Sequence, residues 1–364
     1  MNPPPVNCPP PQNGKPFSPQ NSHPLPPYIP AAKKSGNGVA LTCGICLGIL
    51  LTFFFFLFLS FADESGSLDM SSEIKGKIVT DFDRGSMNYI AVIPVHGVIM
   101  YGENKSGVVT PDLFNAMLSK AEKDTNVSAV IISIDSPGGE VNAADAIYRR
   151  ILAFRQKTGK PVIALMRTIA ASGGYYIAAG CDKIIAGELT LTGSIGVIIS
   201  SYNVTGLLEM IGVKGEVYKS GALKDMLSPT KVRTPEEQAV IQELVKDSYL
   251  KFAGIVAKSR NLPLKKITEG PIGDGRVYHG KKAVEYGMVD KLGDLGTAVD
   301  LCEELAEESG LTVKLYVKEL TFSDIFLSSE SVFRKGTDVR INIPGTAPSV
   351  ELQAGRLYYL PAGL

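Results

Sequence analysis

The 364-residue chain has few of the side chains that usually mark a metal or catalytic site. It contains three histidines, and its five cysteines form neither a zinc-binding spacing nor a small-domain disulfide framework. Its 37 basic and 37 acidic side chains leave no net charge, so it lacks the basic field that nucleic-acid binding needs. We therefore expect no metal, no cofactor and no nucleic-acid partner.

The cysteines allow two further inferences. Cys43 and Cys46 form a C-x-x-C motif inside an apolar run, where we expect neither redox nor metal chemistry. Cys181 and Cys302 are far apart in the sequence, and the sequence alone leaves open whether they pair.

A long apolar run near the N-terminus indicates a membrane anchor. Residues 1–37 are rich in proline, asparagine and serine, which predicts a disordered leader. Residues 38–62 carry no charged side chain, and as a helix they would span roughly 35 Å, enough to cross a membrane. Lysines before the run and carboxylates after it favour a cytoplasmic N-terminus and an extracytoplasmic remainder. We predict a single-pass anchor in the cell membrane; a cleaved signal peptide is the competing interpretation.

The rest of the chain alternates short apolar segments with amphipathic ones, which predicts an α/β domain with a mostly parallel sheet. Thr110 and Pro111 predict the start of one helix, and Thr234 with Glu237 forms a capping box for a longer one. We also expect strands at residues 193–200 and 214–220. The longer helix carries an apolar stripe that we expect to face a core: Ile241, Leu244, Val245, Ser248, Phe252 and Ile255.

The stretch "RTIAASGGYYIAAGCDKI" sets Ser172 between alanines and glycines, after a predicted strand and before a predicted helix. The "SPGG" turn at residues 136–139 has the same setting. Backbone N–H groups at a helix start point outward and can hold an oxyanion, which makes the "SPGG" turn and Gly173 candidate donors beside a serine nucleophile. Each turn by itself is also what any tight strand-to-helix connection looks like.

The base that would activate this serine is less evident. His23 lies in the leader, and neither His96 nor His279 belongs to a supporting motif. A lysine can also serve if burial lowers its pKa from about 10.4 to about 7–8. Lys224 in "KSGALKDMLSP" is such a candidate, although Asp225 is its neighbour. Spacing alone leaves histidine and lysine both open.

Residues 88–317 closely resemble the signal peptide peptidase A family of membrane-anchored serine proteases. The resemblance rests on "IDSPGGEV", "AASGGYYIAAGCDKI", "LTGSIGV", "YKSGALKDMLSP" and "DGRVYHGKKAVEYGMVDKLG", in the order found in that family. It implies that Ser172 is the nucleophile, that Lys224 is the general base, and that Ser194 helps to hold the lysine amine. It also implies that Gly139 and Gly173 supply the oxyanion donors.

The resemblance further implies a Clp/crotonase-like fold with a repeated ββα-type core. It implies a ring-like homo-oligomer in which a neighbouring protomer supplies the lysine, and substrates that are remnant signal peptides or similar apolar peptides. The domain organisation we expect is a leader at 1–37, an anchor at 38–62, a linker at 63–86, a protease domain at 87–318 and an extended tail at 319–364.

Three alternatives remain at this point. A crotonase-type thioester enzyme would use the same oxyanion arrangement without a nucleophilic serine. A catalytically silent oligomer would serve as a scaffold for membrane partners. A Clp-type enzyme would need a histidine base, which makes His96 and His279 the residues to test.

Overall fold

The computed structural model describes Thr52, residues 74–318 and residues 358–359. The predicted leader, nearly all of the predicted anchor and most of the predicted tail lie outside these residues. Within the described part of the chain, no helix has both the length and the apolar character needed to cross a membrane.

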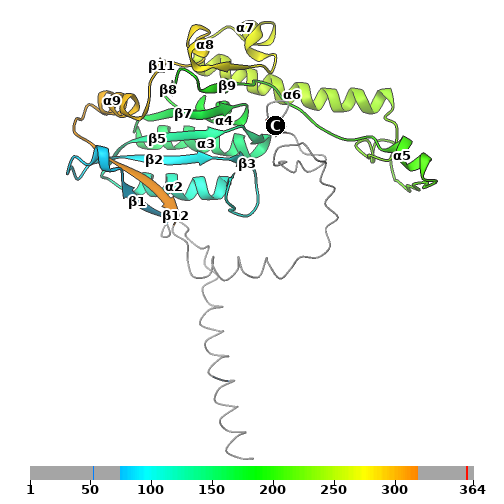
Figure 1. Ribbon diagram of the computed structural model, residues 1–364, viewed down its shortest axis with the longest axis horizontal. Helices are drawn as coiled ribbons and strands as arrows, with labels where there is room; N and C mark the ends of the chain where they lie inside the picture. The colour runs from blue at the N-terminus through cyan, green and yellow to red at the C-terminus, as the bar shows by residue number, and fades with distance from the viewer. Residues whose placement is uncertain (1–51, 53–73, 319–357, 360–364) are drawn as a thin grey trace, which may run out of the picture. The chain divides into compact units, whose positions relative to one another are not determined.

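A nine-stranded sheet forms the centre of the described domain (Figure 1). Neighbouring strands along its central part run parallel, in the order β12-β2-β5-β7-β8-β11. These strands are β12 (Thr312–Lys318), β2 (Tyr89–His96), β5 (Val127–Ser136), β7 (Val162–Ala171), β8 (Lys183–Ala186) and β11 (Lys291–Leu292). At the β12 edge, β1 (Ile74–Ile78) adds an antiparallel strand. Beside the end of β7, β9 (Leu191–Gly193) pairs parallel to it, and β10 (Val277–His279) pairs antiparallel to β9.

A small second sheet lies at the carboxyl ends of the central strands, in the order β13-β6-β3-β4. Its strands are β13 (Tyr358–Tyr359), β6 (Gly139–Glu140), β3 (Val98–Ile99) and β4 (Val108–Val109). The chain therefore passes from β2 through β3 and β4 to a helix, and then from β5 through β6 to the next helix. This order repeats a strand, a short second-sheet segment and a helix, and it positions β6 directly after the central strand β5.

Helices cover both faces of the large sheet. On one face α2 (Pro111–Lys123), α3 (Val141–Thr158) and α4 (Gly173–Ala178) contribute to the larger of two apolar clusters. On the other face α9 (Leu295–Ala306) packs against the second cluster through Ala298, Val299 and Cys302. Fully burying a large apolar side chain contributes roughly 1.5–3 kcal/mol, so these layers hold the strand ends in fixed positions.

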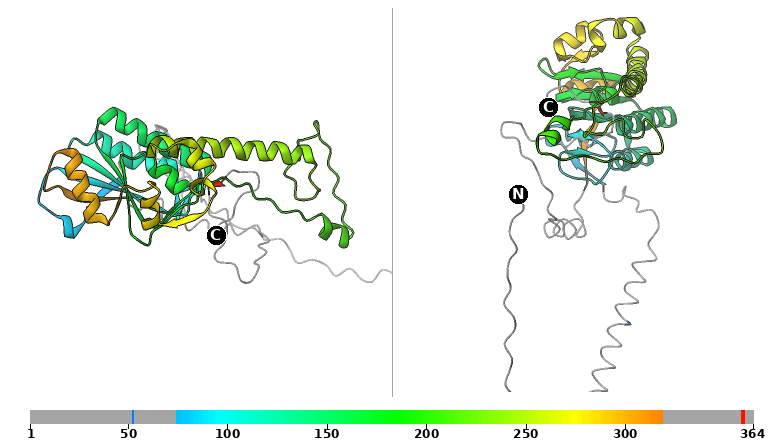
Figure 2. Two further views of the ribbon diagram at one scale, coloured as in Figure 1. Left: turned by 90° about the horizontal axis from the view of Figure 1, so that it is seen from above. Right: turned by 90° about the vertical axis from the view of Figure 1, so that its right-hand side faces the viewer.

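The predicted helix starts are confirmed. The Thr110 hydroxyl accepts a hydrogen bond from the Leu113 N–H at 3.2 Å, and Pro111 occupies the first turn of α2. The capping box of Thr234 and Glu237 opens α6 (Pro235–Arg260). The helix α6 leads away from the sheet towards α5 (Thr205–Met210), as Figures 1 and 2 show. Residues 74–318 also contain the helices η2 (Thr80–Phe82), α7 (Leu264–Thr268), η3 (Pro271–Gly273) and α8 (Gly280–Glu285).

Four expectations need correction. Residues 194–200 contain a single bridge residue, Ile198, and no regular strand, and the described residues 214–220 form no strand. The stripe on α6 is buried only towards its C-terminal end: Phe252 is buried, whereas Leu244 is 44% exposed. The strand β1 lies inside residues 63–86, which the sequence suggested were a linker, and its pairing with β12 makes it part of the sheet. Likewise β13 is a paired strand within the predicted tail.

Cys181 and Cys302 are both buried and free. They belong to the two different apolar clusters, so no disulfide joins them.

Candidate active site

Ser172 occupies the sharp turn between β7 and α4. It occupies the N-cap position of α4 with φ 53° and ψ −113°, a positive-φ conformation that is unusual for a residue with a Cβ atom. Two backbone hydrogen bonds hold this turn: the Ser172 N–H donates to the Gly193 carbonyl, and the Tyr176 N–H donates to the Ser172 carbonyl, both at 2.8 Å. Backbone strain held in this way often marks a functional turn, and it aims the serine side chain out of the helix.

The Ser172 side chain is enclosed. The residue has 0% exposure, and its hydroxyl has no hydrogen-bond partner within the described part of the chain. A buried polar group without a partner costs free energy, so this hydroxyl is unusual among buried polar groups.

The "SPGG" turn and the serine turn touch through their backbones. A Cβ atom placed on Gly173 would lie 3.2 Å from both the Gly138 Cα and the Gly139 nitrogen. A Cβ on Gly139 would lie only 1.9 Å from the Ile99 carbonyl oxygen, because β3 passes directly beside β6. Glycine is therefore required at position 139, and a Cβ at position 173 would be tightly confined; the structure brings the two candidate oxyanion donors together next to Ser172.

Ser194 lies one residue beyond the carbonyl that holds Ser172. It is buried, has φ 50°, and its N–H donates to the Arg276 carbonyl at 2.8 Å. It also lines a cavity of about 420 Å³ whose walls include Val197, Gln242 and Tyr249. The structure therefore places Ser172, Gly173, Gly139 and Ser194 in one region.

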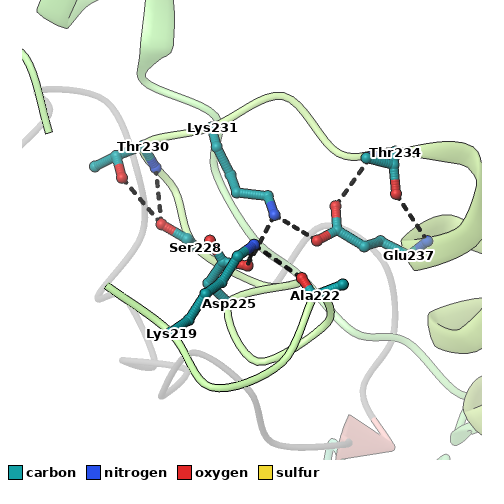
Figure 3. A network of polar contacts seen from close by, with 8 residues as sticks. All are labelled: Lys219, Ala222, Asp225, Ser228, Thr230, Lys231, Thr234 and Glu237. Atoms are coloured by element: carbon teal, nitrogen blue, oxygen red, sulfur yellow. Dashed lines mark hydrogen bonds and ion pairs between the residues drawn. The ribbon is translucent and has the colours of Figure 1, made fainter. Parts of the chain in front are cut away.

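Lys224 lies elsewhere, in an exposed loop before α6. Its N–H donates to the Gly221 carbonyl at 3.2 Å, and no contact to Ser172 is present within the described residues. Hydrogen bonds and ion pairs nevertheless hold this loop in place. Asp225 accepts from Lys219 at 2.7 Å and from Lys231 at 2.9 Å, and Lys231 also bonds Glu237 of the α6 capping box (Figure 3).

Asp225 follows Lys224 directly in the sequence, but its carboxylate bonds two other lysines. Hydrogen bonds from Lys219 and then Lys231 lower the pKa of Asp225 to about 2. The Asp225 carboxylate is thus occupied by two other lysines, and Lys224 is not part of the network drawn in Figure 3.

Neither histidine that the sequence left open contacts Ser172 in the described structure. The His96 Nε2 lies 3.3 Å from the Ser133 hydroxyl, and burial lowers the His96 pKa. The His279 Nδ1 lies 3.1 Å from the Leu189 carbonyl oxygen. No group of three or more histidine, cysteine or acidic side chains suited to a metal ion occurs among the described residues.

Comparison with known proteins decides the family. The model for peptidase family S49 matches residues 154–309. An Enterococcus faecium protein named as a signal peptide peptidase SppA is 40% identical over 237 residues, 64% of this chain and 68% of that protein. A protein of Synechocystis named as a protease is 40% identical over 216 residues, 59% of this chain and 74% of that protein. The chain belongs to peptidase family S49.

Membership of family S49 makes the chain a serine protease. Among solved structures, one described as a membrane-bound stomatin-specific protease matches 58% of this chain and 84% of its own, with 22% identity and a TM-score of 0.36.

The sequence did not reveal the polar contacts that Tyr175, Tyr176 and Asp145 make behind the serine turn. Tyr175 and Tyr176, which follow the serine turn on α4, are both fully buried. The Tyr175 hydroxyl donates to the Met288 carbonyl, and the Tyr176 hydroxyl donates to Asp145 on α3 at 2.7 Å. Asp145 also bonds Lys251 of α6 at 2.8 Å, so one carboxylate links three helices behind the serine turn.

The Asp145 carboxylate is charged in the folded state. Burial alone would raise its pKa, but hydrogen bonds from Lys251 and Tyr176 outweigh burial and lower it. In the sequence, this link is indicated only by the position of Asp145, an acidic residue among the apolar residues of α3 that face the core.

The pairing of β13 with β6 was also missed. Residues 319–364 show only weak secondary-structure patterns in the sequence. A strand of two residues has too little periodicity to be predicted.

Proposed function

We propose that this S49 protease is a membrane-anchored serine endopeptidase with Ser172 as nucleophile and Lys224 as general base. Its N-terminus lies in the cytoplasm, its protease domain is extracytoplasmic, and its substrates are remnant signal peptides or similar apolar peptides. The observation that carries the proposal is the serine turn: a strained, enclosed Ser172 whose neighbour Gly173 touches Gly139 of the second turn.

The reaction follows from these groups. The neutral Lys224 amine takes the proton of the Ser172 hydroxyl as the oxygen attacks the peptide carbonyl carbon. The N–H groups of Gly139 and Gly173 hold the negative charge that develops on the carbonyl oxygen. The lysine ammonium then protonates the leaving amine, and water hydrolyses the acyl-enzyme. Ser194, near the serine turn, accepts a hydrogen bond from the lysine amine and orients it.

We propose that the lysine comes from a neighbouring copy in a ring-like homo-oligomer. Two features support this arrangement. Lys224 is exposed in a tied loop with no contact to the serine of its own chain. The segment that carries it exposes many apolar side chains, which an interface between copies would bury: Tyr202 (84%), Met210 (83%), Tyr218 (92%) and Val232 (69%).

The substrate class has separate support. The Enterococcus relative is named for the cleavage of signal peptides, which are short and apolar. Such peptides bind proteases as extended chains held by main-chain hydrogen bonds.

Purified full chain should cleave an apolar signal-like peptide, with the products identified by mass spectrometry. We expect Ser172→Ala and Lys224→Arg each to lose nearly all activity, because arginine keeps the charge of lysine but cannot act as a base. His96→Gln and His279→Gln serve as controls that retain activity. Retained cleavage in Lys224→Arg with loss in a histidine variant would exclude the lysine base. Failure of the unsubstituted chain would exclude the peptidase and favour a scaffold.

A further inference from the structure

The loop that carries Lys224 has no regular secondary structure of its own. Residues 211–234, between α5 and α6, form only turns, bends and irregular chain. The Lys224 N–H bonds the Gly221 carbonyl at 3.2 Å, and the Ser228 N–H bonds the Asp225 carbonyl at 2.9 Å. A catalytic base must lie within hydrogen-bond reach of the proton it takes. Single turns of this kind are too weak to hold a side chain at one position, so further contacts of the loop matter.

Lys219 bridges the chain on both sides of Lys224 (Figure 3). Its ammonium group donates to the Ala222 carbonyl at 2.8 Å and to Asp225 Oδ1 at 2.7 Å. Ala222 lies two residues before Lys224, and Asp225 follows it directly. One cation therefore fixes the short stretch of backbone to which the Lys224 side chain is attached.

Lys231 connects the same carboxylate to α6. Its ammonium group donates to Asp225 Oδ1 at 2.9 Å and also bonds Glu237. The Glu237 side chain is 1% exposed, and its other oxygen accepts from the Thr234 N–H at 2.9 Å in the capping box. The C-terminal half of α6 is in turn buried in the larger apolar cluster. A continuous series of contacts therefore runs from the core to the residue beside the proposed base.

The network is balanced in charge, since two ammonium groups bond two carboxylates. Hydrogen bonds from Lys219 and then Lys231 lower the pKa of Asp225 to about 2, so this carboxylate is ionised at any pH at which a lysine could act as a base. A lysine that pairs with a carboxylate stays protonated and cannot take a proton. Because Asp225 already accepts from two other lysines, Lys224 is left outside the network among the described residues.

We propose that Asp225, held between Lys219 and Lys231, positions Lys224 for catalysis, and that the same network keeps a free carboxylate away from the Lys224 amine. These three are positioning residues, which act through Lys224 and need not touch the substrate. The inference rests on the proposed function, in which Lys224 is the base, and it adds the residues that present this base. Exposed ion pairs contribute little to stability, so we expect their loss to affect the base more than the fold.

The kinetic test compares Asp225→Asn with a matched control in the full chain. Asparagine keeps the shape of the side chain but removes its charge. We expect kcat to fall about 10–100-fold with KM within about twofold, because the base is misplaced while peptide binding is unchanged. The control is Glu122→Gln on α2, which should leave both constants unchanged. Glu122 also accepts from two cations, Arg150 at 2.6 Å and Lys157 at 2.5 Å.

The pH profile separates positioning and charge from simple loosening of the loop. Between residue 219 and the first turn of α6, the charged side chains are Lys219, Lys224, Asp225, Lys231, Arg233, Glu236 and Glu237. Asp225→Asn raises the net charge of this segment by one, whereas Lys231→Met lowers it by one. Positive charge disfavours a protonated amine and negative charge favours it. We therefore expect the acid limb of kcat/KM to move down by about 0.5–1 pH unit in Asp225→Asn and up by a similar amount in Lys231→Met.

Lys231→Arg is the conservative variant, and it should restore the wild-type profile because arginine keeps the charge and can bond both carboxylates. A loop that is merely loosened would lose kcat in both Asp225→Asn and Lys231→Met without opposite displacements of the acid limb. That result would overturn the inference, as would wild-type kinetics in Asp225→Asn. Either would leave Ser172 and Lys224 standing as the reacting pair.

A second readout does not depend on hydrolysis. Competitive acetylation with acetic anhydride at a series of pH values, followed by peptide mass spectrometry, gives the pH midpoint at which Lys224 becomes reactive. We expect the midpoint to move in the same opposite directions in Asp225→Asn and Lys231→Met. Equal midpoints in the wild type and both variants would overturn the inference. If Lys224→Arg still hydrolyses peptide, the proposed base is wrong, and that outcome is distinct from unmoved midpoints.

Discussion

Two local features of Ser172 each lower the stability of the folded protein. Its positive φ is unfavourable for a residue with a Cβ atom, and its buried hydroxyl has no partner within the described residues. Each feature costs roughly 1–3 kcal/mol by general experience. The surrounding backbone bonds to Gly193 and Tyr176 offset this and keep the turn in place. A residue that weakens the fold where chemistry is expected is typical of a catalytic side chain.

Ser172→Ala should therefore separate activity from stability. We expect hydrolysis to be lost while the free energy of unfolding rises by about 1 kcal/mol, since an unpartnered hydroxyl is removed. Urea unfolding measures this change. Ser136→Ala is the matched control: that buried hydroxyl accepts from the Gly138 N–H at 3.1 Å, and its removal should lower stability. A marked loss of stability in Ser172→Ala would contradict this description of the turn.

Gly173→Ala should damage catalysis more than folding. The added Cβ would press on the Gly138 and Gly139 backbone at 3.2 Å and spread the two turns apart. Loss of one oxyanion donor lowers kcat about 10²–10³-fold, and we expect a fall of that order. Steady-state kinetics give the value. Gly254→Ala in α6, where a Cβ meets nothing within 4 Å, should leave kcat unchanged and stabilise the helix by about 0.5–1 kcal/mol. A wild-type kcat in Gly173→Ala would remove Gly173 from the donor pair.

At the scale of elements, Asp145 links the helices behind the site. It joins α3, which follows β6, to α4, which follows Ser172, and to α6 through Lys251. The link is rigid because Tyr176 is fully buried and its ring packs on Phe252 with centroids 5.0 Å apart. We expect Tyr176 and Asp145 to act as positioning residues that hold the two proposed oxyanion turns relative to one another.

Tyr176→Phe should lower kcat about tenfold with little change in KM, because it removes the bond between α3 and α4 but no substrate contact. The matched control is Tyr148→Phe, whose ring packs edge-to-face on Tyr176 at 5.3 Å and which leaves the Asp145 bond intact. Equal kinetics in the two variants would show that the Asp145 link does not position the turns.

Sequence predicts the elements whose signals are local. Thr110 and Thr234 mark helix starts because their caps lie within a few residues, and alternating apolar segments predict the parallel strands. The turns at Gly139 and Gly173 follow from the glycines themselves, although their contact is a tertiary feature that no local pattern records. The expected strand at 214–220 fails because its apolar residues find no partner in the described chain.

At the scale of the whole molecule, the segment before α6 exposes a large apolar surface to solvent. Met210 and Tyr218 are 83% and 92% exposed, and the N-terminal half of α6 adds further exposed apolar groups. Sequence patterns do not show whether a surface that covers these residues belongs to the same chain or to another copy. The position of Lys224 relative to Ser172 is unpredictable for the same reason.

Met210→Glu combined with Tyr218→Glu should dissociate the oligomer, because an interface cannot accommodate two unpaired buried charges. We expect a shift towards monomer in analytical ultracentrifugation and at least a tenfold loss of hydrolysis. Met87→Glu, which alters an apolar residue that is 79% exposed before β2, is the matched control and should leave both unchanged. A double variant that stays assembled would place the interface elsewhere.

The central claim is that one copy supplies Lys224 to the Ser172 of the next. The most direct measurement mixes Ser172→Ala with Lys224→Ala in equal amounts after each has been dissociated and reassembled. If the lysine acts between copies, random assembly of a head-to-tail ring restores about a quarter of the wild-type activity from two inactive proteins. If the mixture stays as inactive as its components while wild type reassembles with full activity, the serine and its base belong to the same chain, and the account is wrong.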